Sequence, residues 1–337
     1  MTPQRQEALC DAIHPPLAVP FPPMNAIETH ELTRAFGARV VVERLSLAAP
    51  QGAVFGFLGP NGAGKTTTVR MLAALIAPTA GSAVVAGYRL GEDDQMIRCN
   101  VGLLTESPGL YERLSAHQNL RFFARLYDLD ATRAGAQTER YLRMLGLWDR
   151  RDDPVGSFSK GMRQKLAIAR ALLHEPEVIF LDEPTAGLDP EAARTVREFI
   201  KELRAEGRTI FLTTHNLPEA DELCDVIAVF RTRLLRIGAP AALRAELFGN
   251  GVRIRIAGAA ESFMDAVRAL PFVHAAAADG DVLNISLDNP DEQNPPLVRA
   301  LIEAGAAIRY VEPREHSLED VYLQLVREGE PQERAHA

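Results

Sequence analysis

Residues Gly59 to Thr66 have the types and spacing needed to hold a phosphate group. Their sequence, GPNGAGKT, matches the phosphate-binding pattern GxxxxGK[ST] at every fixed position. Glycines allow the backbone to turn tightly, so that successive N–H groups converge on one anion. Lys65 would supply a mobile positive charge for the β- and γ-phosphates of a nucleotide, and the Thr66 hydroxyl a ligand for Mg²⁺. The segment predicts a nucleotide site made by Gly59, Pro60, Asn61, Gly62, Ala63, Gly64, Lys65, Thr66 and Thr67.

Two carboxylates and a histidine, each following an apolar run, could complete a hydrolytic site. VIFL (178–181) leads into Asp182 and Glu183, and TIFLTT (209–214) leads into His215. An aspartate that closes an apolar strand is well placed to hold Mg²⁺, and Glu183 could polarise the attacking water as a general base. Adjacent acids more often lie in a solvated turn, and a lone histidine is more often a satisfied polar residue. The apolar runs favour the site, with His215 at the γ-phosphate.

The elements that must position these residues alternate between strands and helices. Residues 53–58 suit a buried strand, and residues 66–76 have the apolar spacing of a helix. This alternation predicts a mainly parallel sheet, with chemistry at the carboxyl ends of its strands. The aromatic block 110–129 predicts a helical subdomain over about residues 106–165. Further strands are expected within residues 26–57, at 81–87 and at 101–104.

Composition limits the possible classes of protein. The 337 residues can hold one large domain and a smaller one, and a formal charge of −8 argues against non-specific nucleic-acid binding. No apolar run approaches the length of about eighteen residues expected of a membrane span, and no secretory signal is visible. The three cysteines, Cys10, Cys99 and Cys224, have no metal-binding spacing and fit a reduced cytoplasm.

Changes in composition predict the division of the chain. Residues 1–24 contain the proline-rich segment HPPLAVPFPPM and are expected to be a disordered tail, with Met24 as a possible natural start. Residues 25–245 are expected to form the nucleotide-binding domain. Residues 250–328 are expected to form a small accessory domain, followed by a disordered tail over 329–337.

The accessory domain has a βαββαβ pattern, which suits a ferredoxin-like fold. Strands are expected at 252–256, 272–278, 281–287 and 307–311, and helices at 261–270 and 296–304. Asp279-Gly280 predicts a hairpin turn between the second and third strands. No residue set in this part suggests catalysis. A packing or dimer-supporting role is favoured, and ligand sensing stays open.

Taken in order, these motifs resemble those of the ATP-binding cassette (ABC) ATPases, over about residues 26–240. FSKGM (158–162) is similar to the LSGGQ signature, and AGLD (186–189) resembles the D-loop. The resemblance implies that Glu183 is the catalytic glutamate and His215 the switch histidine. It also implies that Phe36, otherwise best read as a core residue, stacks on adenine. The residues that it adds to the nucleotide site are Phe36, Glu106, Ser159, Lys160, Gly161 and Asp189.

Two positions depart from the pattern of this family. Glu106 stands where the Q-loop normally has glutamine; its carboxylate could ligate Mg²⁺, but its charge disfavours close approach to the γ-phosphate. In the signature, Lys160 replaces a glycine and Met162 a glutamine, whereas Ser159 and Gly161 remain. We hypothesise that Lys160 adds a positive charge across the nucleotide interface and partly offsets Glu106.

The resemblance also implies an architecture. The expected fold is α/β: a P-loop cassette with a mainly parallel core sheet, an antiparallel β subdomain and a helical subdomain, followed by the small α+β domain. Two cassettes would pair head to tail, so that the signature of each closes over ATP held by the other. This chain has one set of motifs, and the second cassette is expected to be a copy of itself. ATP and Mg²⁺ are the expected cofactors.

The function implied is that of an ATPase subunit that drives export, of the drug, antibiotic or polysaccharide type. A separate integral membrane permease is expected to contact residues 110–127 and to hold the chain at the cytoplasmic face of the cell membrane. No nucleic-acid partner is expected. The alternative is a soluble ABC-type ATPase of translation or DNA repair. Such proteins usually carry tandem cassettes or long coiled-coil insertions, and this chain has neither.

Overall fold

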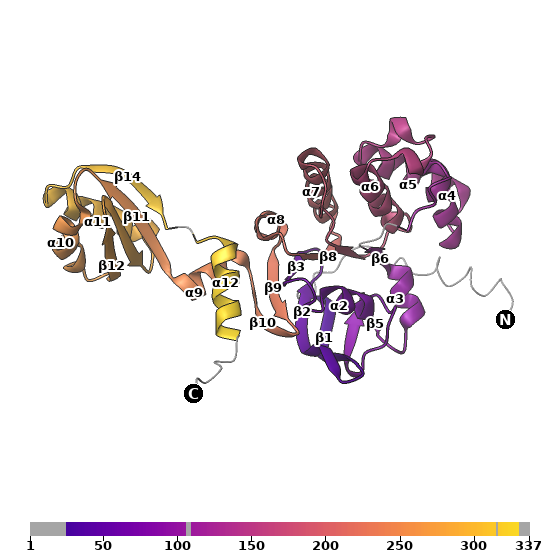
Figure 1. Cartoon of the computed structure of the whole chain (residues 1–337), viewed down its shortest axis with the longest axis horizontal. Coiled ribbons are helices and arrows are strands. Elements are labelled where there is room, and N and C mark those ends of the chain that lie inside the picture. Colours follow the sequence, from indigo (N-terminus) through magenta and orange to yellow (C-terminus); the bar gives the residue numbers. More distant parts are fainter. Residues whose placement is uncertain (1–24, 106–108, 315, 330–337) are drawn as a thin grey trace, which may run out of the picture. The chain divides into compact units, whose positions relative to one another are not determined.

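A computed structural model describes residues 25–105, 109–314 and 316–329 of the chain (Figure 1). The described residues divide into two units, with the boundary between Ala239 and Pro240. In the part of the chain that the structure describes, the first unit contains two sheets and the second contains one, and each unit has its own apolar core. Among the described residues, no helix combines the length and the apolar character that crossing a membrane requires.

The first unit begins with an antiparallel sheet. Its strands, in the order β2-β1-β4-β5, are β1 (Asn25–Phe36), β2 (Arg39–Pro50), β4 (Ala80–Val85) and β5 (Tyr88–Arg89). In β2, buried Leu45, Leu47 and Ala49 alternate with exposed residues, which is the pattern of a strand with one face on a core. This sheet is the antiparallel subdomain that the sequence predicts.

The second sheet is the core of the first unit, and it is mainly parallel. Five strands pair in parallel and β10 is added antiparallel to β9. Strands β3, β7 and β8 are buried along their whole length, which explains their unbroken apolar runs. The strands, in the order β10-β9-β3-β8-β7-β6, are β3 (Val54–Leu58), β6 (Val101–Leu104), β7 (Val178–Asp182), β8 (Thr209–Thr214), β9 (Val226–Arg231) and β10 (Arg233–Gly238).

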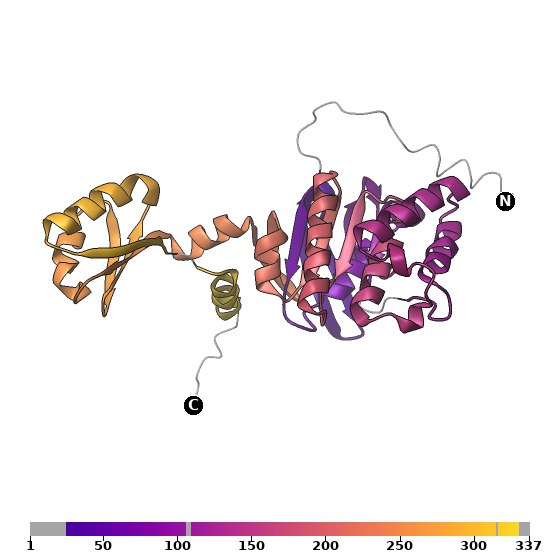
Figure 2. The ribbon, with the colours of Figure 1, turned by 90° about the horizontal axis from the view of Figure 1, so that it is seen from above.

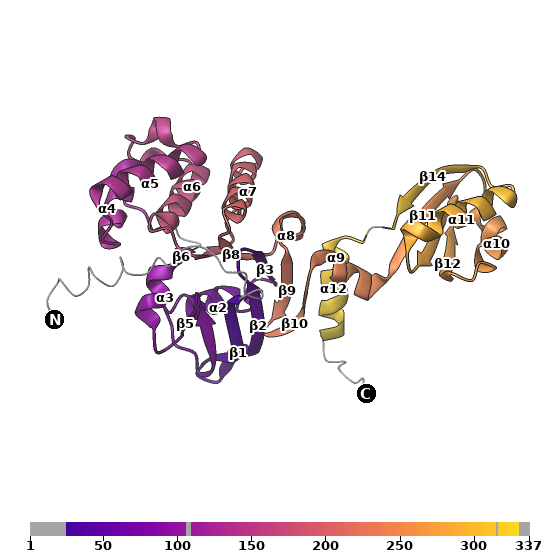
Figure 3. The ribbon, with the colours of Figure 1, turned by 180° about the vertical axis from the view of Figure 1, so that it is seen from behind.

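Helices lie on both sides of this sheet (Figures 1 and 3). Helices α4 to α7 lie on one side, and α2 lies with the antiparallel sheet on the other. The helices are α2 (Lys65–Leu72), α3 (Asp94–Asn100), α4 (Ala116–Leu126), α5 (Ala131–Met144), α6 (Lys160–Leu172), α7 (Pro190–Ala205) and α8 (Leu217–Leu223), with 3₁₀ helices at Trp148–Arg150 and Val155–Ser157. Helix α2 ends before the expected residue 76, because Ala74 has a left-handed φ of 53°.

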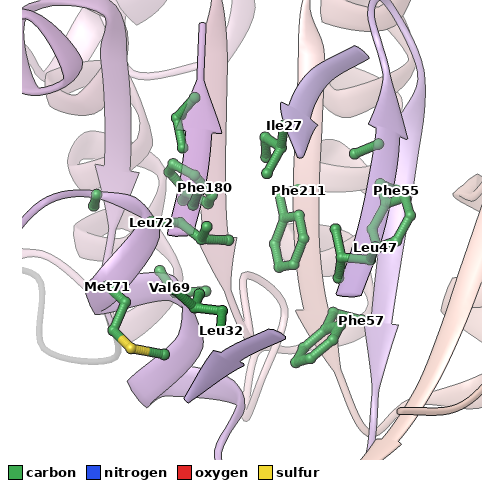
Figure 4. Packing of buried hydrophobic residues seen from close by; sticks show 14 of the residues in the cluster. Ile27, Leu32, Leu47, Phe55, Phe57, Val69, Met71, Leu72, Phe180 and Phe211 are labelled. Atoms are coloured by element: carbon green, nitrogen blue, oxygen red, sulfur yellow. The ribbon is translucent and has the colours of Figure 1, made fainter. Parts of the chain in front are cut away.

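Aromatic rings fill the space between the core sheet and α2. The rings of Phe55 and Phe211 stack at 5.3 Å, and those of Phe57 and Phe230 lie 4.7 Å apart. Figure 4 shows Met71 and other apolar side chains of α2 in the same cluster. Buried aromatic pairs add about 1 kcal/mol each to the burial of their surface. This core therefore fixes the strands whose ends carry the predicted site.

The second unit is an antiparallel α+β sandwich. Its sheet order, β12-β13-β11-β14, is the ferredoxin-like order that the βαββαβ pattern predicts. Figure 2 shows α11 (gold) alongside the strands of this sheet. The elements are α9 (Pro240–Phe248), β11 (Asn250–Ile256), a 3₁₀ helix (Ala260–Phe263), α10 (Met264–Arg268), β12 (Val273–Asp279), β13 (Val282–Leu287), α11 (Pro290–Glu303), β14 (Ile308–Pro313) and α12 (Leu318–Gly329).

The hairpin of this unit is displaced by one residue from its predicted position. Asp279 is the last residue of β12 and pairs with Val282, so the loop consists of Gly280 and Asp281. Gly280 has a φ of 60°, which glycine adopts without a steric cost. The glycine is therefore the first loop residue, and not the second.

In the first unit, His174 is held as a neutral ring. Its Nε2 lies 3.0 Å from the Val101 carbonyl oxygen, its ring stacks on Tyr127 at 3.9 Å, and its Nδ1 is buried without a hydrogen-bond partner. Burial lowers the pKa of His174 to about 4, although the bond to Val101 acts in the other direction. The unfolded chain therefore binds a proton here at a higher pH than the folded chain does.

We predict that this histidine makes the protein less stable as the pH falls from about 6.5 towards about 4. Between pH 7 and pH 5 the loss of unfolding free energy due to His174 should be about 2 kcal/mol. His174→Phe, which keeps a ring against Tyr127 but cannot titrate, should reduce the difference in stability by that amount. Urea unfolding of both proteins at the two pH values measures it. An equal loss in parent and variant would contradict the assignment.

Candidate active site

Two glycines allow the backbone of the phosphate loop to lie directly against the neighbouring strands. A Cβ atom on Gly59 would lie 2.2 Å from the Phe230 carbonyl oxygen of β9. A Cβ on Gly64, whose φ is 107°, would lie 2.6 Å from the Val41 carbonyl oxygen of β2. Neither site can take a larger residue without moving a backbone. Gly62, by contrast, has open space around it, as a loop that receives an anion requires.

Lys65 begins α2 and turns its ammonium group into this loop. The residue is 6% exposed, and its Nζ donates hydrogen bonds to the carbonyl oxygens of Gly59 (2.7 Å) and Pro60 (3.4 Å). The same Nζ lies 3.3 Å from Glu183 Oε1. A buried ammonium group must be paired, and here the loop and a carboxylate share the pairing. The loop and the end of β7 are thus joined through one charge.

Asp182, the last residue of β7, is 2% exposed and accepts a hydroxyl hydrogen bond at each carboxylate oxygen. Thr66 Oγ1 donates to Oδ2 at 2.8 Å, and Thr213 Oγ1 donates to Oδ1. Thr213 stands opposite Asp182 in the register of β7 and β8. The structure therefore brings together Thr66 and Asp182, two of the three oxygen donors that the sequence predicts for Mg²⁺. The contribution of Thr213 was not predicted.

Glu183 follows with a backbone conformation that is uncommon for its residue type. Its φ is 50°, and its N–H donates to the Thr213 carbonyl oxygen at 3.0 Å. Its Oε2 lies 2.9 Å from His215 Nδ1 and its Oε1 faces Lys65. Strained residues persist where the surroundings fix them, and this carboxylate is fixed from two sides. The two predicted catalytic residues, Glu183 and His215, are hydrogen-bonded to each other.

The signature segment forms a helix start. Ser159 is the N-cap of α6, and its Oγ accepts a hydrogen bond from the Met162 N–H at 3.2 Å. Asp189 caps α7 in the same way, with Oδ1 accepting from the Ala192 N–H at 2.8 Å. The ammonium group of Lys160 lies against Gly187 of the same chain. Within the described part of the chain, no hydrogen bond joins Ser159 to the phosphate loop.

The structure explains why residue 161 is glycine, which the sequence alone does not. A Cβ on Gly161 would lie 2.9 Å from the Cβ of Ala192, in the first turn of α7. The two helix starts can therefore approach only because residue 161 is glycine. Nearby, the buried Gln164 Nε2 donates to the Pro184 carbonyl oxygen at 3.1 Å and ties α6 to the segment after Glu183.

Phe36 and Glu106 are two further residues that were predicted to lie at the nucleotide site. Phe36 ends β1 and is 49% exposed, so it is not the core residue that a lone phenylalanine suggests. The guanidinium group of Arg34 lies over its ring at 4.5 Å, and its Nη1 donates to the Ala77 carbonyl oxygen at 2.8 Å. About half of the Phe36 surface therefore stays accessible to a ligand. Glu106 lies outside the described residues.

The donor set suits a magnesium ion that is shared with phosphates. Among the residues described, no group of three or more His, Cys, Asp or Glu side chains could hold a metal alone. Mg²⁺ in nucleotide sites is usually held by one or two protein oxygens, with phosphates and waters completing its coordination. Thr66 Oγ1 and the Asp182 carboxylate, 2.8 Å apart, are oxygen donors of this kind. The residues present therefore fit such an ion.

The fold and this site define a P-loop ATPase, and comparison with known proteins gives its family. Residues 42–186 match the family model described as ABC transporter. Residues 238–326 match the model described as ATP-binding protein DrrA1-3-like, C-terminal domain. The chain belongs to the ATP-binding proteins of ABC transporters.

Relatives match the chain over most of its length. It is 37% identical to the daunorubicin resistance ATP-binding protein DrrA3 of Streptomyces coeruleorubidus, over 89% of this chain and 96% of that protein. It is 35% identical to the Nod factor export ATP-binding protein I of Rhizobium sp. (strain N33), over 89% and 96%. A solved ATP-binding subunit of an ABC transporter superimposes with a TM-score of 0.62 at 32% identity, covering 66% of this chain and 94% of that one.

The contact between Gly161 and Ala192 gives a testable prediction. Gly161→Ala should lower the unfolding free energy by about 1–3 kcal/mol, because the added methyl group is too close to Ala192. Ala192→Gly removes the opposing methyl group and should cost about 1 kcal/mol alone, as glycine does in a helix. In the double variant the loss should be smaller than the sum of the two. Denaturant unfolding of all four proteins measures this coupling, and strictly additive losses would show that the two residues do not meet.

Proposed function

We propose that this chain is the ATP-hydrolysing subunit that powers export through a separate membrane permease, and that Lys65, Asp182, Glu183 and His215 carry out its chemistry. The observation that supports this best is the position of Glu183. Its carboxylate lies between the ammonium group of the phosphate loop, at 3.3 Å, and the His215 ring, at 2.9 Å. A general base must lie within reach of the reacting phosphate and be held in orientation, and the contacts of Glu183 with Lys65 and His215 support such a role.

In the proposed reaction, Glu183 accepts a proton from the attacking water as that water bonds to the γ-phosphorus and the bond to ADP breaks. His215 orients the carboxylate through its hydrogen bond to Oε2. Bound phosphates would compete with Glu183 for the ammonium group of Lys65, because this group is attracted more strongly to the phosphate charges than to one carboxylate. When Lys65 turns to the phosphates, Glu183 keeps His215 as its partner and is free to act as a base.

Asp182 and Thr66 would hold Mg²⁺, which offsets the negative charge of the phosphates when bound. The hydroxyl groups that now bond to Asp182 preserve its orientation for this purpose. Thr67 would cover the phosphates from α2. Phe36 would stack on the adenine with the ring face that Arg34 does not cover. Glu106 would add a carboxylate near the metal.

A second copy of the chain would complete the site. Ser159, Lys160, Gly161 and Asp189 would then lie across the interface from the phosphate loop of the partner. Ser159 in particular has no hydrogen bond to the phosphate loop of its own chain within the described residues, which supports a role opposite another one. Lys160, now against Gly187, could reach across and offset Glu106 there.

The permease would contact the aromatic cluster of the helical subdomain, which consists of Tyr111, Phe122 and Phe123, together with the exposed Leu126 of α4. Tyr111 and Leu126 are 49% and 64% exposed, and the Tyr111 and Phe122 rings meet at 5.0 Å. An exposed cluster of aromatic side chains is typical of a protein interface. Through it the chain would lie at the cytoplasmic face of the cell membrane.

Export as the direction of transport is supported by the names of the relatives. The Rhizobium protein is named for Nod factor export, and the Streptomyces protein for daunorubicin resistance. The match of the second unit to the C-terminal domain of DrrA1-3-like proteins supports the same group. No feature of the chain favours the soluble alternative in translation or DNA repair.

We predict that Glu183→Gln binds ATP but hydrolyses it at least about 100-fold more slowly, because the amide cannot accept the proton. With MgATP the variant should accumulate as a dimer, which light scattering after gel filtration detects. The matched control, Lys65→Ala combined with Glu183→Gln, should stay monomeric. If Glu183→Gln stays monomeric with bound ATP, even with the permease present, the proposed dimer is wrong.

A further inference from the structure

One buried acid in the first unit has no role in the reaction proposed above. Glu219 lies in α8 and is only 2% exposed. Its Oε2 accepts a hydrogen bond from Thr214 Oγ1 at 3.1 Å, and its Oε1 is buried without a hydrogen-bond partner. Acids of this kind are rare, because burying a carboxylate costs free energy unless it is paired. Its retention at this place calls for a physical reason.

The position of Glu219 supplies that reason. Thr214, which directly precedes His215, donates its hydroxyl hydrogen to Glu219 Oε2, and the hydroxyl of Thr185, two residues after Glu183, lies close enough to the carboxyl to lower its pKa. One side chain thus reaches the two segments that carry the proposed catalytic pair. Contacts of α8 hold it there.

Those contacts form a short network around Asn216. The Glu219 N–H donates to Asn216 Oδ1 at 3.2 Å, and the Asn216 N–H donates to Thr214 Oγ1 at 2.9 Å. Thr214 Oγ1 in turn donates to Glu219. The two bonds of Thr214 join the end of β8 to the start of α8, and the bond between Glu219 and Asn216 caps the helix itself. A shift of α8 would therefore move the residue before His215.

The surrounding charges do not pair with Glu219. Burial raises its pKa, and the neighbouring Glu183 adds to this effect, whereas the threonine hydroxyls and Arg197 oppose it. Arg197, from α7, already forms an ion pair with Glu222, with Nε 3.1 Å from Oε2. The surroundings therefore stabilise Glu219 through hydrogen bonds and not through an ion pair. A neutral side chain of the same shape can accept the same hydrogen bonds.

We propose that Glu219 is a positioning residue of the ATPase site. Its carboxyl group joins the end of β8 to the segment after β7 and so keeps Glu183 and His215 at hydrogen-bonding distance. This inference rests on the roles proposed above for Glu183 and His215. Misplacing a catalytic group by about 1 Å can cost about 100-fold in rate, so a side chain that never touches the nucleotide can control turnover.

The test compares Glu219→Ala, Glu219→Gln and Glu222→Ala in the full chain, with ATP turnover and ATP affinity measured separately. Glu219→Ala should lower kcat by about 10- to 100-fold while the KM for ATP changes less than about twofold. Glu219→Gln keeps an acceptor for Thr214 and should stay within about threefold of the parent. Glu222 lies on the same helix and pairs with Lys201 and Arg197, and its replacement should leave kcat within about twofold.

Three results would overturn the proposal: an unchanged kcat in Glu219→Ala, a Gln variant as slow as the Ala variant, or a loss confined to KM. Thermal unfolding checks that each variant is folded. If Glu219→Ala does not fold, the double variant Thr185→Val, Thr214→Val replaces it, since it removes only the two hydroxyls. A full kcat in that variant would also overturn the proposal.

Failure of this proposal can be told apart from failure of the proposed function. If Glu183→Gln retains turnover, the assigned catalytic roles are wrong whatever Glu219 does. If Glu183→Gln is inactive and Glu219→Ala has the kcat of the parent, the catalytic roles stand and only the positioning role falls.

Discussion

The site depends on how two adjacent carboxylates are compensated at the end of one buried strand. Asp182 is almost fully buried and Glu183 is its neighbour, so their charges repel in surroundings that screen them poorly. Each is compensated differently: Asp182 by the hydroxyls of Thr66 and Thr213, and Glu183 by Lys65 and His215. These partners come from the phosphate loop with α2 and from β8. The site therefore depends on the parallel sheet, which brings the phosphate loop and the carboxyl ends of β7 and β8 to one place.

Other contacts link the starts of α6 and α7 to the same site. Gln164 of α6 holds the Pro184 carbonyl next to Glu183, and Gly161 allows α6 to approach α7. Ser159, at the start of α6, is thus attached to the segment that carries the proposed base.

Much of this could be predicted from the sequence, because the motifs are local. The phosphate loop, the acids after VIFL and the histidine after TIFLTT are each read from a few adjacent residues, and the parallel sheet follows from apolar runs. Thr213 and Gly161 were not assigned their contacts, because these depend on the register of β7 with β8 and on the approach of two helices. The hairpin loop lies one residue later than predicted, because an Asp-Gly pair indicates that a turn is near but not which two residues form its loop. Glu219 gave no signal, because one acid in a helix looks like any other.

In the proposed dimer, each chain would supply half of the nucleotide site, and Ser159 would act on the phosphate loop of a second copy. The most direct test mixes two inactive chains, one with Lys65→Ala and one with Ser159→Ala, and measures ATP turnover. A mixed dimer has one site with both substitutions and one site with neither. Mixing should therefore restore turnover to a substantial fraction of the parent value. Turnover that stays at the level of the separate variants, although mixed dimers form, would contradict it.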